Sequence, residues 1–298
     1  MRISSTQIAD NSIYGITQSY ARYAVAQNEV STGKQVQQPS DNPSGIAQSL
    51  GFRNQYDQIN EYQHTITQAN SFLSATDTAL GSVNDLLRQA RTIAVQGGSN
   101  VITNDTRSAL VTQIQNIITQ VGTIANSTDG TRYIFAGQRT DKPPYTVDTA
   151  GNYTYVGGST VTNDGAVKLD VGRGDTAQIN VPGDTIFTPI LANLKSLESD
   201  LSLGQSQAVS NTDLANLDTQ INNVLSVRAD VGAKINRLTQ KSSDYDVTKD
   251  NLTKLISNIE DADYAKTVVE YQTAQTAYQA AVQSTAKIYQ TSLLDFLK

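Results

Sequence analysis

The chain has 298 residues and a formal net charge of −6, and only 38% of its residues are hydrophobic and 6% aromatic. The acidic balance argues against a nucleic-acid partner, which would need clustered Lys and Arg to displace counterions from phosphate. The chain has no Cys, which excludes disulfides, thiolate metal sites and thiol nucleophiles. It also lacks any apolar run of the roughly 18 residues that span a bilayer, and its N-terminus lacks the apolar region of a cleaved signal peptide. We therefore expect no membrane partner.

The first segment, 1–42, is predicted to be a terminal assembly helix followed by a link. Its apolar residues recur at steps of three and four, which indicates a helix with one apolar face. The link contains Pro39 and Pro43, which fix their own φ and disfavour helix in the residue before each. We expect it to be extended and to let the helices on either side take independent directions. We expect Asp41 or Ser40 to cap the next helix. The predicted assembly residues here are Ile13, Ile16, Tyr20, Tyr23 and Val30.

Two long helical arms are predicted, over 43–129 and 189–260. A 3-4 repeat runs from Phe52 to Ala94, and another runs from Leu214 to Ile259. Such sustained spacing is typical of helices packed along a seam, so we expect the arms to lie side by side. "QGGSN" at 96–100 should end the first helix, and Thr103 or Asn104 should cap a shorter one.

The segment 130–188 is predicted to be a small antiparallel β domain. Short β-branched or aromatic stretches alternate there with the turn signals "TAGN", "NDGA", "GRGD" and "VPGD". "GRGDT" contains Arg173-Gly174-Asp175, an adhesion tripeptide that is better explained here as a hairpin turn. A short helix is expected after Pro189. The fold class is therefore mainly α with a β insert: long antiparallel helices from both chain ends and a small β domain between them.

The tail, 261–298, is predicted to be a second assembly helix, capped by Asp261. Tyrosine suits interfaces because it buries a large ring and keeps a hydroxyl for a wet edge. Nothing follows this helix to cover its apolar face, so we expect the face to be buried only against other molecules. The predicted assembly residues are Tyr264, Val268, Tyr271, Tyr278, Val282, Ile288, Leu293, Leu294, Phe296 and Leu297.

The sequence gives no positive support for an enzyme. His64, the single histidine, is predicted to point away from the seam of its helix. Carboxylate pairs such as Asp261 with Asp263 are two residues apart and diverge on a helix. No phosphate-binding loop or calcium loop is present. We therefore expect no catalytic residue, cofactor or metal.

Four segments carry a resemblance to a known family. "STGKQVQQPSDNPSGIA" (31–47) resembles a segment of the flagellin superfamily. "TDTALGSVNDLLRQARTIAVQG" (76–97) and "RYIFAGQRTDKPPY" (132–145) are similar to its helical core and to the entry into its β domain. The tail at 262–298, ending in "SLLDFLK", and the prolines at 39 and 43 resemble the hook–filament junction branch rather than flagellin itself.

The resemblance implies a structural subunit of the bacterial flagellum, outside the cell. It implies a ring of like copies in which the terminal segments form an inner tube and the arms surround it. The implied partners are the first hook-associated protein, flagellin, and an export chaperone on the C-terminal helix. The implied route is type III export without a cleaved signal peptide.

Two alternatives stay open, namely a flagellin that builds the filament and a secreted adhesin or tip protein that uses the Arg-Gly-Asp turn. For the favoured function we expect free chains to be proteolytically labile at about 1–40 and 262–298, because ordering a lone terminal helix costs ~1–2 kcal/mol per residue. Leu294→Asp or Phe296→Asp should leave the core folded and block incorporation.

Overall fold

The computed structural model describes residues 5–99, 101–157 and 166–296, and the side chains of residues 5, 6, 8, 9 and 288–296 lie outside that description. The chain divides into two compact units. One is Ile59–Asp246, which we call the core unit. The other joins Met1–Gln58 with Val247–Lys298, and we call it the terminal unit.

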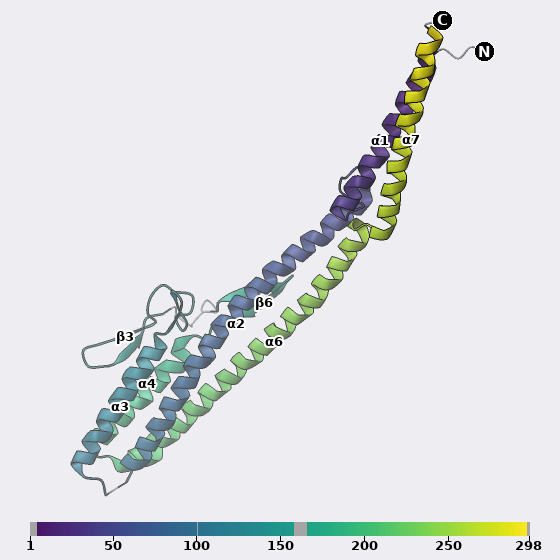
Figure 1. Ribbon diagram of the computed structural model, residues 1–298. Coiled ribbons are helices and arrows are strands. Elements are labelled where there is room, and N and C mark those ends of the chain that lie inside the picture. The colour runs from purple at the N-terminus through teal and green to yellow at the C-terminus, as the bar shows by residue number, and fades with distance from the viewer. Residues whose placement is uncertain (1–4, 100, 158–165, 297–298) are drawn as a thin grey trace. The chain divides into compact units, whose positions relative to one another are not determined.

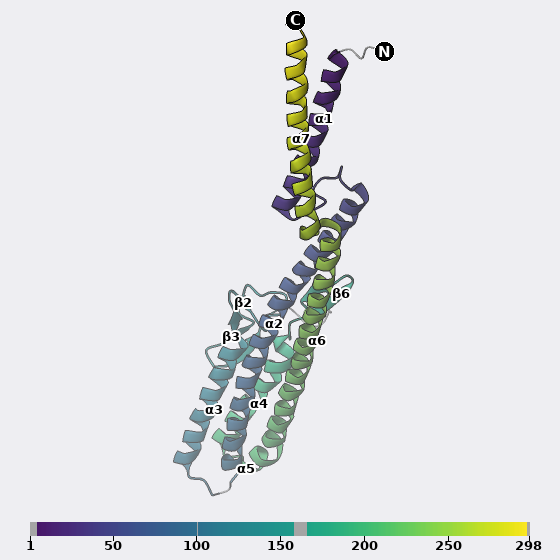
Figure 2. The same ribbon diagram turned by 45° about the vertical axis from the view of Figure 1, so that its right-hand side comes forward.

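The core unit is built on helices that lie side by side (Figure 2). Two of them, α2 and α6, are long and extend into the terminal unit as well, whereas α3 and α4 lie wholly within the core unit. A three-residue helix, α5, and one turn of π-helix, η2, connect α4 to α6. The bounds are α2 Pro43–Gly97, α3 Asn104–Ala125, α4 Gly183–Leu203, α5 Ser206–Ala208, η2 Val209–Asp213 and α6 Leu214–Glu260.

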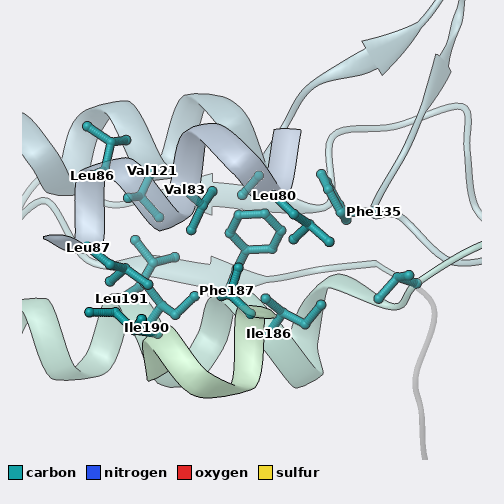
Figure 3. Packing of buried hydrophobic residues seen from close by; sticks show 14 of the residues in the cluster. Leu80, Val83, Leu86, Leu87, Val121, Phe135, Ile186, Phe187, Ile190 and Leu191 are labelled. Carbon is teal, nitrogen blue, oxygen red and sulfur yellow. The ribbon is translucent and has the colours of Figure 1, made fainter. Parts of the chain in front are cut away.

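The predicted seam of α2 is buried in the core unit. From Ile59 to Ala94 its 3-4 positions are almost all buried, and Leu73, Leu80 and Leu87 are fully so. A second stripe that includes Phe72 and Leu86 is buried as well, so α2 packs on more than one neighbour. Figure 3 shows α2 and α4 side chains meeting around Phe187, whose ring centroid lies 4.6 Å from that of Phe135.

Helices α2 and α6 run antiparallel in the core unit. Asp77 pairs with Arg228 at 2.8 Å, and Arg91, further along α2, pairs with Asp218, earlier on α6, at 2.6 Å. Arg228 falls on the 3-4 repeat that runs along α6 from Leu214 to Ile259. Its guanidinium meets a carboxylate of the facing helix, which explains how the seam tolerates a charge. The predicted side-by-side arms and the fold class are confirmed.

The middle of the chain forms three separate two-stranded antiparallel ladders rather than one sheet among the described residues. The predicted strands are present but short, and a ladder of two short strands needs helices to cover it. Tyr145 of β3 provides such packing, since its hydroxyl lies 2.9 Å from the carbonyl of Gly183 in α4. The bounds are β1 Thr128–Asp129, β2 Arg132–Tyr133, β3 Tyr145–Val147, β4 Tyr153–Tyr155, β5 Lys168–Gly172 and β6 Asp175–Gln178.

The predicted start of the helix at Pro189 is wrong, because α4 begins at Gly183 and contains Pro189. Pro182 occupies the N-cap instead. Proline in a helix costs one hydrogen bond and crowds the preceding turn. Here Ile186, Phe187, Ile190 and other apolar residues of α4 are buried, so tertiary packing outweighs that local cost.

The terminal unit contains α1 (Ser5–Thr32) and α7 (Tyr264–Phe296), which lie side by side in both views (Figures 1 and 2). Two predicted caps are wrong here. The N-cap of α2 is Asn42, whose Oδ1 accepts the N–H of Gly45 at 2.9 Å. The N-cap of α7 is Asp263, whose Oδ1 accepts the N–H of Lys266 at 3.2 Å.

Asp41, which had been expected to cap α2, makes other contacts. Asp41 accepts the N–H groups of Gln37 and Gln38 and so stabilises the turn that contains Pro39. The pKa of Asp41 is lowered, and the hydrogen bond from Gln38 is the largest cause. Pro43 is the first residue of α2, a position where its missing N–H removes no helical hydrogen bond.

Candidate assembly surface

Tyrosines form the main contact between α1 and α7. The ring of Tyr23 stacks on Tyr278 with centroids 5.9 Å apart and an interplanar angle of 10°, and it lies 5.5 Å from the ring of Tyr271. Tyr20 also meets Tyr278, at 5.6 Å. The hydroxyl oxygens of Tyr23 and Tyr271 are 3.4 Å apart, and this contact is the leading cause of a raised pKa at Tyr23. These rings align the two helices while their hydroxyls stay near water.

The terminal unit has almost no apolar core among its described residues. Its buried apolar side chains are Ala26, Val36 and Leu252. By contrast, Ile13, Tyr20, Val25, Val269 and others on α1 and α7 are exposed. Val25 and Val269 are 59% and 62% exposed.

An open groove of about 550 Å³ runs between α1 and α7. Its floor is apolar, and its rim carries Arg22, Glu29 and Glu270. Partial burial, with a smaller effect of the nearby Glu270 carboxylate, raises the pKa of Glu29. The lining residues are Ala21, Arg22, Val25, Ala26, Glu29, Val269, Glu270, Thr273, Ala274 and Ala277. The groove has the apolar character of surfaces that accept an amphipathic helix.

A cluster of polar side chains lies where α1 and α7 meet the long helices. Glu260, the last residue of α6, is only 8% exposed. Its carboxylate accepts hydrogen bonds from Lys34 Nζ at 2.8 Å, from Arg53 Nη2 at 2.6 Å and from Ser49 Oγ. The Arg53 contact is the leading cause that lowers the pKa of Glu260, to about 2. We call these four residues the Glu260 clamp.

The structure gives the predicted assembly residues different surroundings. Tyr23, Tyr271 and Tyr278 meet one another, Tyr20 joins them from its exposed position, and Ile16, Val30 and Val268 are half-buried on the same two helices. Ile13, Tyr264 and Val282 are exposed. The side chains of Ile288, Leu293, Leu294 and Phe296, and the whole of Leu297, lie outside the described residues. The assembly role of all these residues stays a prediction.

Sequence reasoning missed the groove and the clamp. Val25 and Val269 lie outside the 3-4 frame that was followed, although Ala21–Val25 and Val269–Thr273–Ala277 form a second stripe at helical spacing. A search for two stripes on each helix would have found them. The clamp had no comparable signal, since Lys34 and Glu260 lie 226 positions apart in the chain.

The Arg-Gly-Asp segment is a hairpin turn, as predicted. It joins β5 to β6, and Gly174 has φ of 75°, which a side chain would disfavour. The carboxylate of Asp175 binds Arg237 at 2.7 Å and also binds Lys241. Lys241 first and then Arg237 lower the pKa of Asp175. A receptor would have to displace both cations to reach this carboxylate, so the structure does not favour the adhesin alternative.

His64 is exposed, as predicted. In the part of the chain that the structure describes, no three His, Asp or Glu side chains converge as metal ligands would. Over the same residues, no helix has an apolar stretch of the length and hydropathy needed to cross a bilayer.

Comparison with known families supplies two matches. The profile of the bacterial flagellin N-terminal helical region matches residues 3–140, and that of the bacterial flagellin C-terminal helical region matches residues 214–297. Together they cover most of the chain and include α1, α2, α3, α6 and α7.

Individual relatives agree with these matches. The chain is 28% identical to flagellar hook-associated protein 3 of Escherichia coli K12 over 325 residues, covering 100% of both chains. It is 29% identical to flagellar hook-associated protein 3 of Salmonella typhimurium, covering 94% of this chain and 95% of the relative. The crystal structure of FlgL from Bacillus cereus aligns with a TM-score of 0.60 at 21% identity, covering 70% of this chain and 99% of that one, which supports the fold.

Proposed function

This chain belongs to the bacterial flagellin family, and from that premise we propose that it is a structural subunit of the junction between hook and filament. The similarity to two hook-associated proteins 3 along their full or nearly full lengths supports the junction rather than the filament. We further propose that its role is mechanical and not catalytic.

One observation carries the proposal: several large apolar side chains of α1 and α7 are exposed and few are buried, whereas the core unit has an extensive buried apolar cluster. Fully burying one exposed Val or Ile side chain contributes about 1.5–3 kcal/mol. A single molecule cannot gain this energy on α1 and α7, but neighbouring molecules in an assembly can supply the missing contacts. The terminal unit is therefore the proposed assembly surface.

The proposed partners follow from a position at the junction. Like copies would form a ring, the first hook-associated protein would contact it on the hook side, and flagellin on the filament side. Before assembly an export chaperone would cover the exposed face of α7. Export would use the flagellar type III route. Free chains should be cut by protease within about 1–40 and 262–298, first toward the two chain ends, before the core unit is cut, because the terminal helices have little core.

A matched set of variants tests the assembly surface. Val25→Asp and Val269→Asp place a charge in the groove, and Val95→Asp is the control, since Val95 is a 55% exposed helical valine of the core unit. All three variants should melt within about 0.5 kcal/mol of wild type as monomers, because exposed substitutions cost little. The two groove variants should fail to restore filaments to a deletion strain, while Val95→Asp restores them.

The deletion strain itself distinguishes the junction from the filament. We expect hooks without filaments, and flagellin released into the medium. If the purified protein alone grew into long filaments that restored swimming, it would be a flagellin. Full rescue by both groove variants would show that the groove is not an assembly surface.

A further inference from the structure

The Glu260 clamp connects three segments that are distant in the chain. Its carboxylate is held by the link after α1, through Lys34, and by the first turns of α2, through Ser49 and Arg53. The backbone carbonyl of the same Glu260 accepts the N–H of Gln35 at 2.8 Å. One residue at the end of α6 therefore binds the link by both its side chain and its main chain.

The next residues extend this connection to α7. The N–H of Ala262 donates to the carbonyl of Gly33 at 2.9 Å, and Lys34 and Asp261 form an isolated antiparallel bridge. The chain thus leaves α1 and enters α7 at one hydrogen-bonded point. The link that contains Pro39 is not the free connection that was expected, because its first residues are fixed to the end of α6.

The clamp also differs from an ordinary surface ion pair. The Glu260 side chain is 10% exposed, whereas those of Lys34 and Arg53 are 41% and 46% exposed. A carboxylate buried to this degree depends on its cations, because leaving it unpaired costs far more than a surface pair contributes. The arrangement therefore strongly favours the one geometry in which link, α2 and α6 meet.

We propose that Glu260 is a positioning residue: its contacts fix the starting point of α1 and α7, so that ordered structure extends outward from the clamp into both terminal helices in single molecules. The physiological meaning of this role rests on the proposed function, since it would present the groove in one orientation for assembly. The Tyr23 contacts and the groove lie on the part of the helix pair that the clamp would order.

Hydrogen exchange of the purified full-length chain tests the proposal. In wild type, peptides from 24–36 and 264–275 should be protected, and protection should fall toward both chain ends. In Glu260→Gln, which keeps the shape and removes the charge, these peptides should exchange at least about tenfold faster. Peptides from the core unit should be unchanged, which also shows that the variant folds.

Asp218→Asn is the matched control. Asp218 also lies on α6 and pairs with an arginine of α2, but its side chain is 46% exposed. Removing the charge of Asp218 should leave the exchange rates of all peptides within about twofold of wild type, because an exposed pair contributes little. The conservative Glu260→Asp keeps the charge on a shorter side chain and should recover part of the protection that Glu260→Gln loses.

Two results would overturn the proposal. One is a hydrogen-exchange rate in Glu260→Gln that stays, for the peptides near the clamp, within about twofold of the wild-type rate. The other is an equal acceleration in the core unit, which would make Glu260 a general stabilising residue. Neither result depends on a flagellar role, so the proposal is decided even if the deletion strain assembles normal filaments.

If that strain lacks filaments, Glu260→Gln should restore fewer of them than Asp218→Asn does, and equal restoration would remove the role in assembly.

Discussion

The core unit and the terminal unit are both helical, yet they bury apolar residues very differently. In the core unit the 3-4 repeat of α2 meets α3, α4 and α6, and leucines such as Leu80 and Leu87 are completely covered. In the terminal unit a similar repeat on α1 packs mainly against α7, and Tyr20 and Val25 stay exposed. The same periodicity thus produces a closed core where several helices surround it and an open surface where only two helices meet.

The largest expected effect is in the core unit. Phe187→Ala removes a fully buried ring and should lower the free energy of unfolding by about 3–5 kcal/mol. Tyr23→Ala removes a half-buried ring at the terminal pair and should cost about 1 kcal/mol or less. Urea unfolding followed by circular dichroism measures both. Equal losses would mean that the two units do not differ in the way described.

A second test uses a buried carboxylate of the core unit. Asp213, in η2, is 1% exposed, and burial together with the nearby Asp200 carboxylate raises its pKa to about 6. An unfolded Asp titrates near about 3.9, so the folded state is favoured by the proton that Asp213 holds, and this contribution is lost as pH rises through about 6. Asp213→Asn should therefore be more stable than wild type by roughly 2 kcal/mol at about pH 8 and equal to it near about pH 4. Thermal melts at the two pH values measure the difference, and an advantage that does not change with pH would contradict the assignment.

The terminal unit should respond to acid with the opposite sign. The pKa of Glu260 is lowered to about 2, from an ordinary value of 4.5, mainly by Arg53. Its contribution is fully present above about pH 4.5 and is lost as pH falls through about 2. The terminal unit of wild type should exceed that of Glu260→Gln in stability by about 1–2 kcal/mol near neutral pH, and this advantage should vanish near about pH 2. Urea unfolding across this pH range tests the sign, which would be wrong if the advantage grew in acid.

The smallest expected effect concerns the hairpin turn. Asp175→Asn weakens the contacts with Arg237 and Lys241, which are partly exposed, so it should cost only about 0.5–1 kcal/mol. Adhesion to host cells should be unchanged by this substitution, and by Asp175→Ala, if the turn is purely structural. Loss of adhesion in both variants would restore the adhesin alternative.

The sequence predicted the long helices well because their signal is periodic and local. Leu73, Leu80 and Leu87 recur at heptad spacing, and the absence of proline from 44 to 142 permits a helix of that length. The start of α4 was missed because Pro189 reads locally as a break, whereas burial of Phe187 and Ile190 favours a continuous helix. The sequence predicted the strands of the middle segment but not their grouping into three separate ladders, because strand patterns do not reveal which strands pair.

The candidate site was predicted only where its residues follow a local helical repeat. Tyr23, Tyr271 and Tyr278 follow the repeat of their helices, and the repeat identified them. Glu260 is one of three acidic residues, with Asp261 and Asp263, at a helix end, and its partners come from the other end of the chain. Only a structure brings such residues together.

The stacked tyrosines have a practical consequence for spectroscopy. The chain contains no Trp, so tyrosine dominates its near-ultraviolet absorption and emission. Tyr23 faces Tyr278 at 5.9 Å in a nearly parallel arrangement, a geometry in which neighbouring aromatic transitions interact. Near-ultraviolet circular dichroism of the unlabelled protein should therefore include a signal from the closed pair of α1 and α7, and this signal should fade when the two helices separate.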